Sequence, residues 1–178
     1  PARYDREEIR TRLGLHGKKV ISYMCSLDWG GSRDLDTILS AVQRVEQKRS
    51  DIVLLIIGGG ILQEHFQKMS ADLKLKSISF TGLISHESVP EYLAASDLAL
   101  IYMRDDPGNR TRFSLKLLEY LCMGKTVVGH LAGATREALG EYCVLSTDLI
   151  EDFAEKIIQA LDALPGARDA RKYIIEHH

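Results

Sequence analysis

Short apolar runs that suit buried strands alternate along this chain with longer segments whose apolar residues repeat at helical spacing. Lys19–Cys25 and Asp51–Ile57 are almost continuously apolar, as expected for strands that are covered on both faces. Asp34–Gln47 instead carries apolar residues at positions 35, 38, 39, 42 and 45, the stripe of an amphipathic helix. Strands that are joined through helices pair in parallel by right-handed crossovers. The alternation therefore predicts a Rossmann-like, doubly wound α/β fold with a parallel sheet of about six strands.

The remaining elements follow the same alternation. Further strands are expected at 77–80, 97–102, 126–128 and 142–145. Further helices are expected at 62–73, 86–95, 114–123, 136–139 and 149–164. The polar segment 103–112 contains Pro107-Gly108 and is expected to be a loop. We divide the chain into a lead-in segment with a short helix (1–18), one domain (19–164) and a C-terminal helix (165–178).

Composition argues against several classes of protein. A formal net charge of −2 gives no reason to expect nucleic acid or an anionic membrane as a partner. No apolar run reaches the roughly 20 residues that span a bilayer, and no His or Cys cluster has the spacing of metal ligands. Cys25, Cys122 and Cys143 leave one thiol unpaired in any disulfide scheme, which favours reduced cysteines and a cytoplasmic protein. Because the chain begins with Pro1 rather than Met, we expect a fragment or a processed product.

A ligand site is expected where the strands end, because parallel sheets of this kind bind ligands outside the carboxyl ends of their strands. Five loops reach that edge, and each contains glycine, which lets a ligand approach the backbone closely. They are 26–33, 58–61, 82–86, 103–113 and 129–135. The first resembles neither a dinucleotide-binding fingerprint nor a P-loop, so alone it is weak support for a phosphate site.

The helix expected from Ser114 carries the most specific signal. A serine hydroxyl and unpaired backbone amides at a helix N-terminus suit a phosphate group. Glu119, about one and a half turns later, is a candidate to hold sugar hydroxyls, although it also has the spacing to pair with Lys116. The helix is expected to end at Gly124, which tolerates left-handed backbone angles. Together these features predict a site for a nucleotide or a nucleotide sugar.

Several basic residues at the same edge have two interpretations. Arg33 opposes the dipole of the helix that it precedes, so it is either a solvated side chain or a clamp on a pyrophosphate. The loop before Ser114 contains three arginines, which either face solvent or bind phosphate oxygens in pairs. His130 follows a strand and either contacts a substrate or has a structural role, whereas His86 is expected near a helix start.

These residues resemble the C-terminal domain of the group-1 retaining glycosyltransferases, which have the GT-B fold. The most specific match is Leu117-Leu-Glu-Tyr-Leu-Cys-Met-Gly-Lys-Thr-Val-Val128, which resembles the family's Leu-Glu-Ala-Met-Ala-X-Gly-Lys-Pro-Val-Val signature. Weaker similarities extend over most of the chain, at 5–14, 33–41, 55–60, 78–85 and 92–97.

The resemblance implies a role for each matched position. Glu119 would bind the ribose of a nucleotide, and the backbone amides of Ser114 and Leu115 would bind its diphosphate. Arg33 would replace a phosphate-binding lysine of the family, and Lys116 could also stabilise the phosphates. Further implied donor contacts come from the turns after the second and third strands and from the position of the family's first motif acid: Gly59, Gly82, Leu83, Ile84 and Thr111.

Two positions depart from the family pattern. Thr111 stands where the family has an acid that meets the donor sugar. Ser26 stands where the family has a phosphate-binding arginine, for which Arg110, Arg112 or Lys116 could substitute. The segment 133–137 resembles a glycine-rich loop of the family and would close the rim of the site.

The implied function is transfer of a glycosyl group from a nucleoside-diphosphate sugar, with no cofactor and no metal. The acceptor would bind a missing N-terminal domain, through which peripheral contact with a membrane stays open, so this chain is expected to be inactive alone. Two alternatives remain: a nucleotide-sugar epimerase domain of the same fold, or a non-catalytic interaction module. The sequence does not distinguish UDP, GDP and ADP as the nucleotide.

Overall fold

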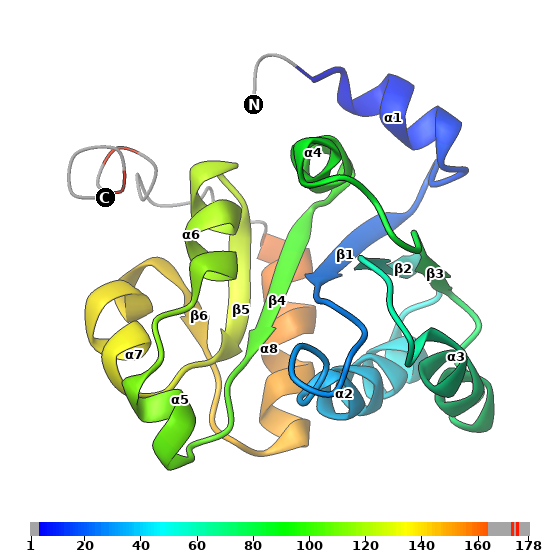
Figure 1. The fold of residues 1–178 in the computed structure, drawn as a ribbon. Helices are drawn as coiled ribbons and strands as arrows, with labels where there is room; N and C mark the ends of the chain where they lie inside the picture. Colours follow the sequence, from blue (N-terminus) through cyan, green and yellow to red (C-terminus); the bar gives the residue numbers. More distant parts are fainter. Residues whose placement is uncertain (1–3, 164–171, 173, 175–178) are drawn as a thin grey trace.

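The computed structural model describes residues 4–163, 172 and 174, and within them it confirms the α/β architecture (Figure 1). Six strands form one parallel sheet in the order β3-β2-β1-β4-β5-β6. They are β1 (Lys19–Met24), β2 (Ile52–Ile57), β3 (Ile78–Phe80), β4 (Leu98–Tyr102), β5 (Thr126–His130) and β6 (Val144–Leu145). The order reverses between β1 and β4, so the switch point of the sheet lies between those two strands.

Helices cover both faces of this sheet. The helices are α1 (Arg6–Arg12), α2 (Leu35–Lys48), α3 (Gln63–Asp72), α4 (Val89–Ala95), α5 (Pro107–Thr111), α6 (Leu115–Cys122), α7 (Gly133–Leu139) and α8 (Ile150–Ala163). One core cluster joins the sheet to α2, α3 and α8, and the other joins it to α1, α4, α6 and α7. The predicted C-terminal helix at 165–178 lies outside the described residues, apart from positions 172 and 174.

The two cores explain why the strand sequences are continuously apolar. In β2, Ile52, Leu54 and Ile56 belong to the core with α2 and α8. The alternate residues Val53 and Leu55 belong to the core with α4 and α6. Successive side chains of a strand point to opposite faces, so a strand that is buried on both faces needs an apolar residue at every position.

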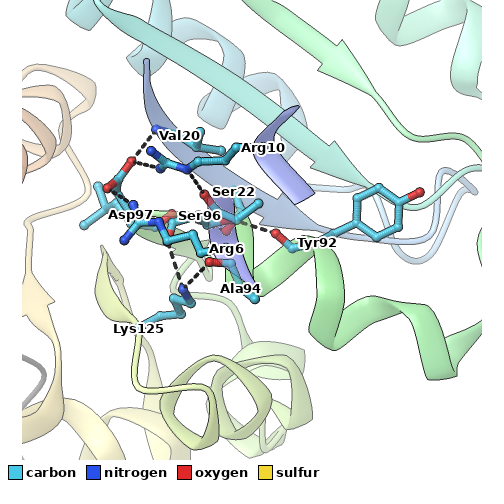
Figure 2. A network of polar contacts seen from close by, with 11 residues as sticks. Arg6, Arg10, Val20, Ser22, Tyr92, Ala94, Ser96, Asp97 and Lys125 are labelled. Carbon is cyan, nitrogen blue, oxygen red and sulfur yellow. Dashed lines mark hydrogen bonds and ion pairs between the residues drawn. The ribbon is translucent and has the colours of Figure 1, made fainter. Parts of the chain in front are cut away.

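The lead-in helix α1 is anchored to the rest of the domain by the polar network in Figure 2. The carboxylate of Asp97 accepts hydrogen bonds from Arg6, from Arg10 (2.5 Å) and from the backbone amide of Val20 (2.7 Å). Lys125 donates to the carbonyl oxygens of Ala94 and Ser96, which end α4. This network lies at the amino end of β4, at the opposite end of the sheet from the loops that the sequence indicates as the ligand site.

One short helix departs from the sequence prediction. The segment predicted as a loop at 103–112 contains α5, which begins at Pro107. The carboxylate of Asp106 caps it by accepting from the backbone amide of Asn109 at 2.9 Å. Proline at the first position of a helix and aspartate immediately before it are standard start signals, but the pattern that follows is too short to show helical periodicity.

Candidate functional site

A cleft of about 310 Å³ opens at the switch point of the sheet. One wall comes from the loop after β1, which includes Ser26, Gly30 and Arg33. The other comes from the end of β4 and from Arg112–Lys116, which leads into α6. The cleft therefore lies where parallel sheets of this topology bind ligands. Four residues expected from the sequence line it: Arg33, Ser114, Leu115 and Lys116.

Three basic side chains of this cleft have no carboxylate partner among residues 4–163. They are Arg33, Arg112 and Lys116. Asp34 in the same wall interacts with them electrostatically but forms no salt bridge with any of the three. Their side-chain donors therefore suit a phosphate group. Of the two interpretations of Arg33, solvated side chain or clamp, its place in the cleft wall is compatible with the second.

The other two arginines of the loop before Ser114 are neutralised by nearby acids. Arg104 lies 2.8 Å from the carboxylate of Asp36 and 3.2 Å from that of Asp34. Arg110 donates two hydrogen bonds to Asp105, at 2.6 and 3.0 Å. Neither arginine lines the cleft. Arg110, one of the three residues proposed to replace the missing arginine, is therefore a poor candidate, and Arg112 and Lys116 are better placed.

Lys116 packs against an aromatic ring and is partly buried in the cleft wall. Its Nζ atom lies 4.3 Å from the centroid of the Tyr23 ring. Burial lowers the pKa of Lys116 below its ordinary value, partly offset by attraction to nearby groups that include Glu119. A bound anion would stabilise the charged form of this side chain.

Cys25 lies in the same cleft but is unsuited to act as a nucleophile. Burial raises the pKa of its thiol to about 11, so the thiol is protonated at neutral pH. All three cysteines are free, as expected for reduced thiols.

Asp34 is a buried acid in the cleft wall that the sequence did not single out. Burial raises the pKa of its carboxyl group, and the positive charge of Arg104 opposes that effect.

The N-terminus of α6 faces the cleft, but of the two amides expected to bind the diphosphate, Ser114 and Leu115, the first is already hydrogen-bonded within the chain. The backbone amide of Ser114 donates to the hydroxyl of Thr135 at 3.1 Å. This amide already has an acceptor within the chain, so its expected contact with a diphosphate stays a prediction, and Ser114 lines the cleft. The amides of Leu115 and Lys116 are in the first turn of α6, where a helix offers its amides no internal acceptor.

Glu119 lies one turn further along α6 and is not part of the cleft wall. Its Oε2 atom is buried and has no hydrogen-bond partner among the described residues. A buried carboxylate oxygen without a donor costs stability, so Glu119 has an unused acceptor position next to the cleft-lining start of α6.

The glycine turns after β2 and β3 pack against each other and against the loop after β1. Gly58 and Gly82 form an isolated antiparallel bridge. A side chain at Gly59 would come within 2.4 Å of the Leu83 amide nitrogen, and one at Gly60 would come within 2.4 Å of the Leu27 carbonyl oxygen. The close approach that the sequence attributed to a ligand is therefore made by neighbouring loops.

The remaining expected contacts lie away from the cleft. Gly59, Gly82, Leu83, Ile84 and Thr111 do not line it. The hydroxyl of Thr111 hydrogen-bonds to the Gly108 carbonyl oxygen at 3.2 Å, within α5. His130 is buried, its Nδ1 lies 2.7 Å from the Met103 carbonyl oxygen, and it does not line the cleft, which supports a structural role.

Two further features, a metal-binding group and a membrane-spanning helix, are absent from the described residues. No group of three or more His, Cys, Asp or Glu side chains in that part of the chain could hold a metal ion. No helix among those residues has both the length and the apolar character to cross a bilayer.

Known structures share this fold over nearly the whole chain. HepE of Anabaena, in complex with UDP and glucose, has a TM-score of 0.76 and 20% sequence identity over 96% of this chain and 47% of its own. The C-terminal domain of the group-1 glycosyl transferase LpcC of Francisella tularensis has a TM-score of 0.77 and 17% identity over 97% of this chain and 92% of its own. At these identities the similarity shows the fold alone.

Curated sequences are similar over shorter stretches. The alpha-D-kanosaminyltransferase of Streptomyces kanamyceticus is 21% identical over 126 residues, which is 70% of this chain and 31% of that protein. The putative teichuronic acid biosynthesis glycosyltransferase TuaH of Bacillus subtilis is 37% identical over 57 residues, which is 32% of this chain and 14% of that protein. The chain thus spans less than a third of the length of these relatives. The family model described as "Glycosyl transferases group 1" matches residues 18–163, and the chain belongs to that family.

Proposed function

We propose that this chain binds the nucleoside diphosphate of a sugar donor and serves as the donor half of a retaining glycosyltransferase. The observation that carries the proposal is the convergence of Arg33, Arg112, Lys116 and the first turn of α6 on one cleft. Glu119, with its unpartnered oxygen, lies one turn along the same helix, as a ribose next to the diphosphate would require.

The arrangement suits the chemistry of glycosyl transfer. When the bond between the sugar and the diphosphate breaks, negative charge grows on the departing phosphate oxygens. Fixed cations and helix amides that already face that position stabilise the charge without reorganising. Arg112 and Lys116 flank the start of α6 and would therefore act on the leaving group rather than on the acceptor.

The acceptor groups are proposed to come from another domain. All five large apolar side chains that are exposed in the described part of the chain follow the carboxyl ends of strands: Trp29, Ile61, Leu83, Leu115 and Leu149. Exposed apolar side chains gathered at one edge are typical of a surface that another structure covers. We expect no transferase activity from this chain alone, and a measurable rate without a partner would refute that statement.

Calorimetric titration with UDP, GDP and ADP tests the proposal. At least one of them should bind, more weakly as salt concentration rises. Arg112→Ala should weaken that binding about tenfold or more, since a hydrogen bond to a charged group contributes roughly 1.5–3 kcal/mol. Arg110→Ala is the matched control: it lies two residues away, is paired with Asp105 and should leave the affinity unchanged within about twofold.

Pyrophosphate separates the ribose contact from the phosphate contacts. Glu119→Ala should weaken binding of the nucleoside diphosphate but not of pyrophosphate, which has no ribose. Lys116→Ala should weaken both. If none of the three nucleotides binds at millimolar concentration, the proposal is wrong and a non-catalytic module is the better interpretation. Conversion of a nucleotide sugar without an acceptor would instead favour the epimerase, which the family match does not favour.

A further inference from the structure

The segment that carries the phosphate-facing groups has its position fixed by a residue on another helix. Arg112, Phe113 and Ser114 join α5 to α6 and have no regular secondary structure of their own. All three line the cleft. A connection of this kind depends on side-chain contacts to hold one conformation, because it has no backbone ladder.

Thr135 supplies those contacts. It lies in the first turn of α7 and has an exposed fraction of 0%. Its hydroxyl donates to the carbonyl oxygen of Arg112 at 3.0 Å and accepts from the amide of Ser114 at 3.1 Å. A hydroxyl has one donor and two acceptor positions, so a single side chain can hold both backbone groups at once. These bonds fix the residues on either side of Phe113.

Gly133 in the same turn of α7 brings the two segments close enough for this contact. A side chain at Gly133 would lie 1.9 Å from the carbonyl oxygen of Arg110, and its φ of +50° also favours glycine. The N-terminal turn of α7 thus contacts residues 110, 112 and 114 in succession. The sequence predicted that segment 133–137 closes the rim of the site, and these contacts indicate that its first turn also supports the cleft wall.

We propose that Thr135 is a positioning residue for the nucleotide site: it holds Arg112 and the start of α6 in the geometry that binds the diphosphate. This inference rests on the proposed function. A segment that is ordered before the ligand arrives loses less conformational freedom on binding, and therefore binds more tightly. Thr135 touches no ligand in this scheme and acts through the backbone of residues 112 and 114.

Calorimetric titration of the whole chain with UDP tests this role in three variants. Thr135→Val has nearly the same shape but no hydroxyl, and should weaken binding about tenfold, equivalent to about 1.4 kcal/mol. Thr135→Ser keeps the hydroxyl and should bind as the parent chain does. Ser22→Ala is the matched control, because it removes another fully buried hydroxyl, which donates to Leu98 in the sheet and lies outside the cleft wall.

The outcomes separate this inference from the proposed function. If the parent chain binds GDP or ADP rather than UDP, the variants are compared with that nucleotide; if it binds none of the three, the proposed function fails and the positioning role fails with it. If the parent chain binds UDP and the folded Thr135→Val variant binds equally well, only the positioning role is overturned. The positioning role is also overturned if Thr135→Ser binds UDP as poorly as Thr135→Val does. It is likewise overturned if Ser22→Ala weakens UDP binding as much as Thr135→Val does.

Amide hydrogen exchange on the parent chain gives a second test that does not depend on a folded variant. The Ser114 amide should be protected before any ligand is added, because Thr135 accepts its hydrogen bond. The amides of Leu115 and Lys116 should become protected only when UDP is added. Rapid exchange at Ser114 in the free chain would overturn the positioning role.

Discussion

Replacing Asp97 by asparagine should destabilise the domain by about 3 kcal/mol, because it leaves a buried arginine without its counter-charge. Figure 2 shows the side chain of Arg10 directed at Asp97. The side chain of Asp97 is 7% exposed and that of its partner Arg10 is 11% exposed. Breaking such a buried pair by removing one partner costs about 3–5 kcal/mol. We expect the lower end of that range. The Arg10 Nε atom keeps its bond to the Ala95 carbonyl oxygen at 2.9 Å, and asparagine can still accept from Val20.

Arg6 provides the matched control, since it contacts the same carboxylate from a more exposed position. Its side chain is 42% exposed, so Arg6→Ala should cost less than about 1 kcal/mol. Urea denaturation followed by circular dichroism measures both variants. For a domain of this size, a loss of 3 kcal/mol corresponds to a fall of about 6–12 °C in Tm.

A double substitution tests the reason for the loss rather than its size. If the cost of Asp97→Asn comes from an orphaned charge, adding Arg10→Met removes that charge and should recover part of the lost stability. A loss below about 1 kcal/mol for Asp97→Asn, or no larger than that for Arg6→Ala, would refute the reasoning. So would a double variant that is less stable than Asp97→Asn alone.

Three further perturbations have defined outcomes. Lys116→Met should stabilise the ligand-free chain by about 0.5–2 kcal/mol and raise its Tm, because partial burial disfavours the Lys116 charge. The same variant should bind UDP more weakly, since it lacks the cation. Gly133→Ala should cost about 3 kcal/mol in urea denaturation, since its side chain would meet the Arg110 backbone at 1.9 Å. Burial lowers the pKa of Lys125 from 10.5 to about 8, so between pH 8 and pH 10.5 the unfolded chain binds more protons than the folded one. Stability relative to Lys125→Met should therefore rise with pH across that window, by up to about 3 kcal/mol.

Each of these three predictions has a control or an outcome that would contradict it. A Lys116→Met variant that melts at a lower temperature than the parent chain would contradict the argument from burial. Gly14→Ala is the control for Gly133: its φ is also positive, at +66°, but nothing lies within 4 Å of the added carbon, so it should cost only about 1 kcal/mol. Burial also raises the pKa of Cys25, so the parent chain and Lys125→Met are compared at each pH to cancel that contribution. A difference in their free energies of unfolding that does not change with pH would refute the prediction for Lys125.

The fold could be predicted from the sequence because its signals are local. The buried strands are largely apolar runs, and each long helix carries an apolar stripe, so their order along the chain implied the parallel sheet. Helix α5 was missed because it depends on two residues, Asp106 and Pro107, rather than on a periodic pattern. The stretch at 86–95, predicted as one helix, is a single 3-10 turn followed by α4.

The site could be predicted only in part, because its details depend on contacts between distant residues. Sequence reasoning found Arg33, Leu115 and Lys116 from their places in the predicted loops and helix. It could not show that the Ser114 amide is already bound, because the acceptor lies 21 residues further along the chain. Nor could it show that glycines such as Gly59 are required by neighbouring loops, since that follows from how the turns pack.

Contacts between distant residues also explain how a chain with a net charge of −2 can present the cationic cleft that we propose as a diphosphate site. Of the three arginines between residues 104 and 112, two are paired with acids: Arg104 with Asp34 and Asp36, and Arg110 with Asp105. Arg112 is left to face the cleft with Arg33 and Lys116. The acids thus decide which basic side chains have no salt bridge and are available to an anion. The electrostatic potential in the cleft, rather than the net charge of the chain, is what an anion there would experience. It follows that removing Asp105 would unpair Arg110, and that the set of cations available to the proposed site depends on the acids that pair with the other two arginines.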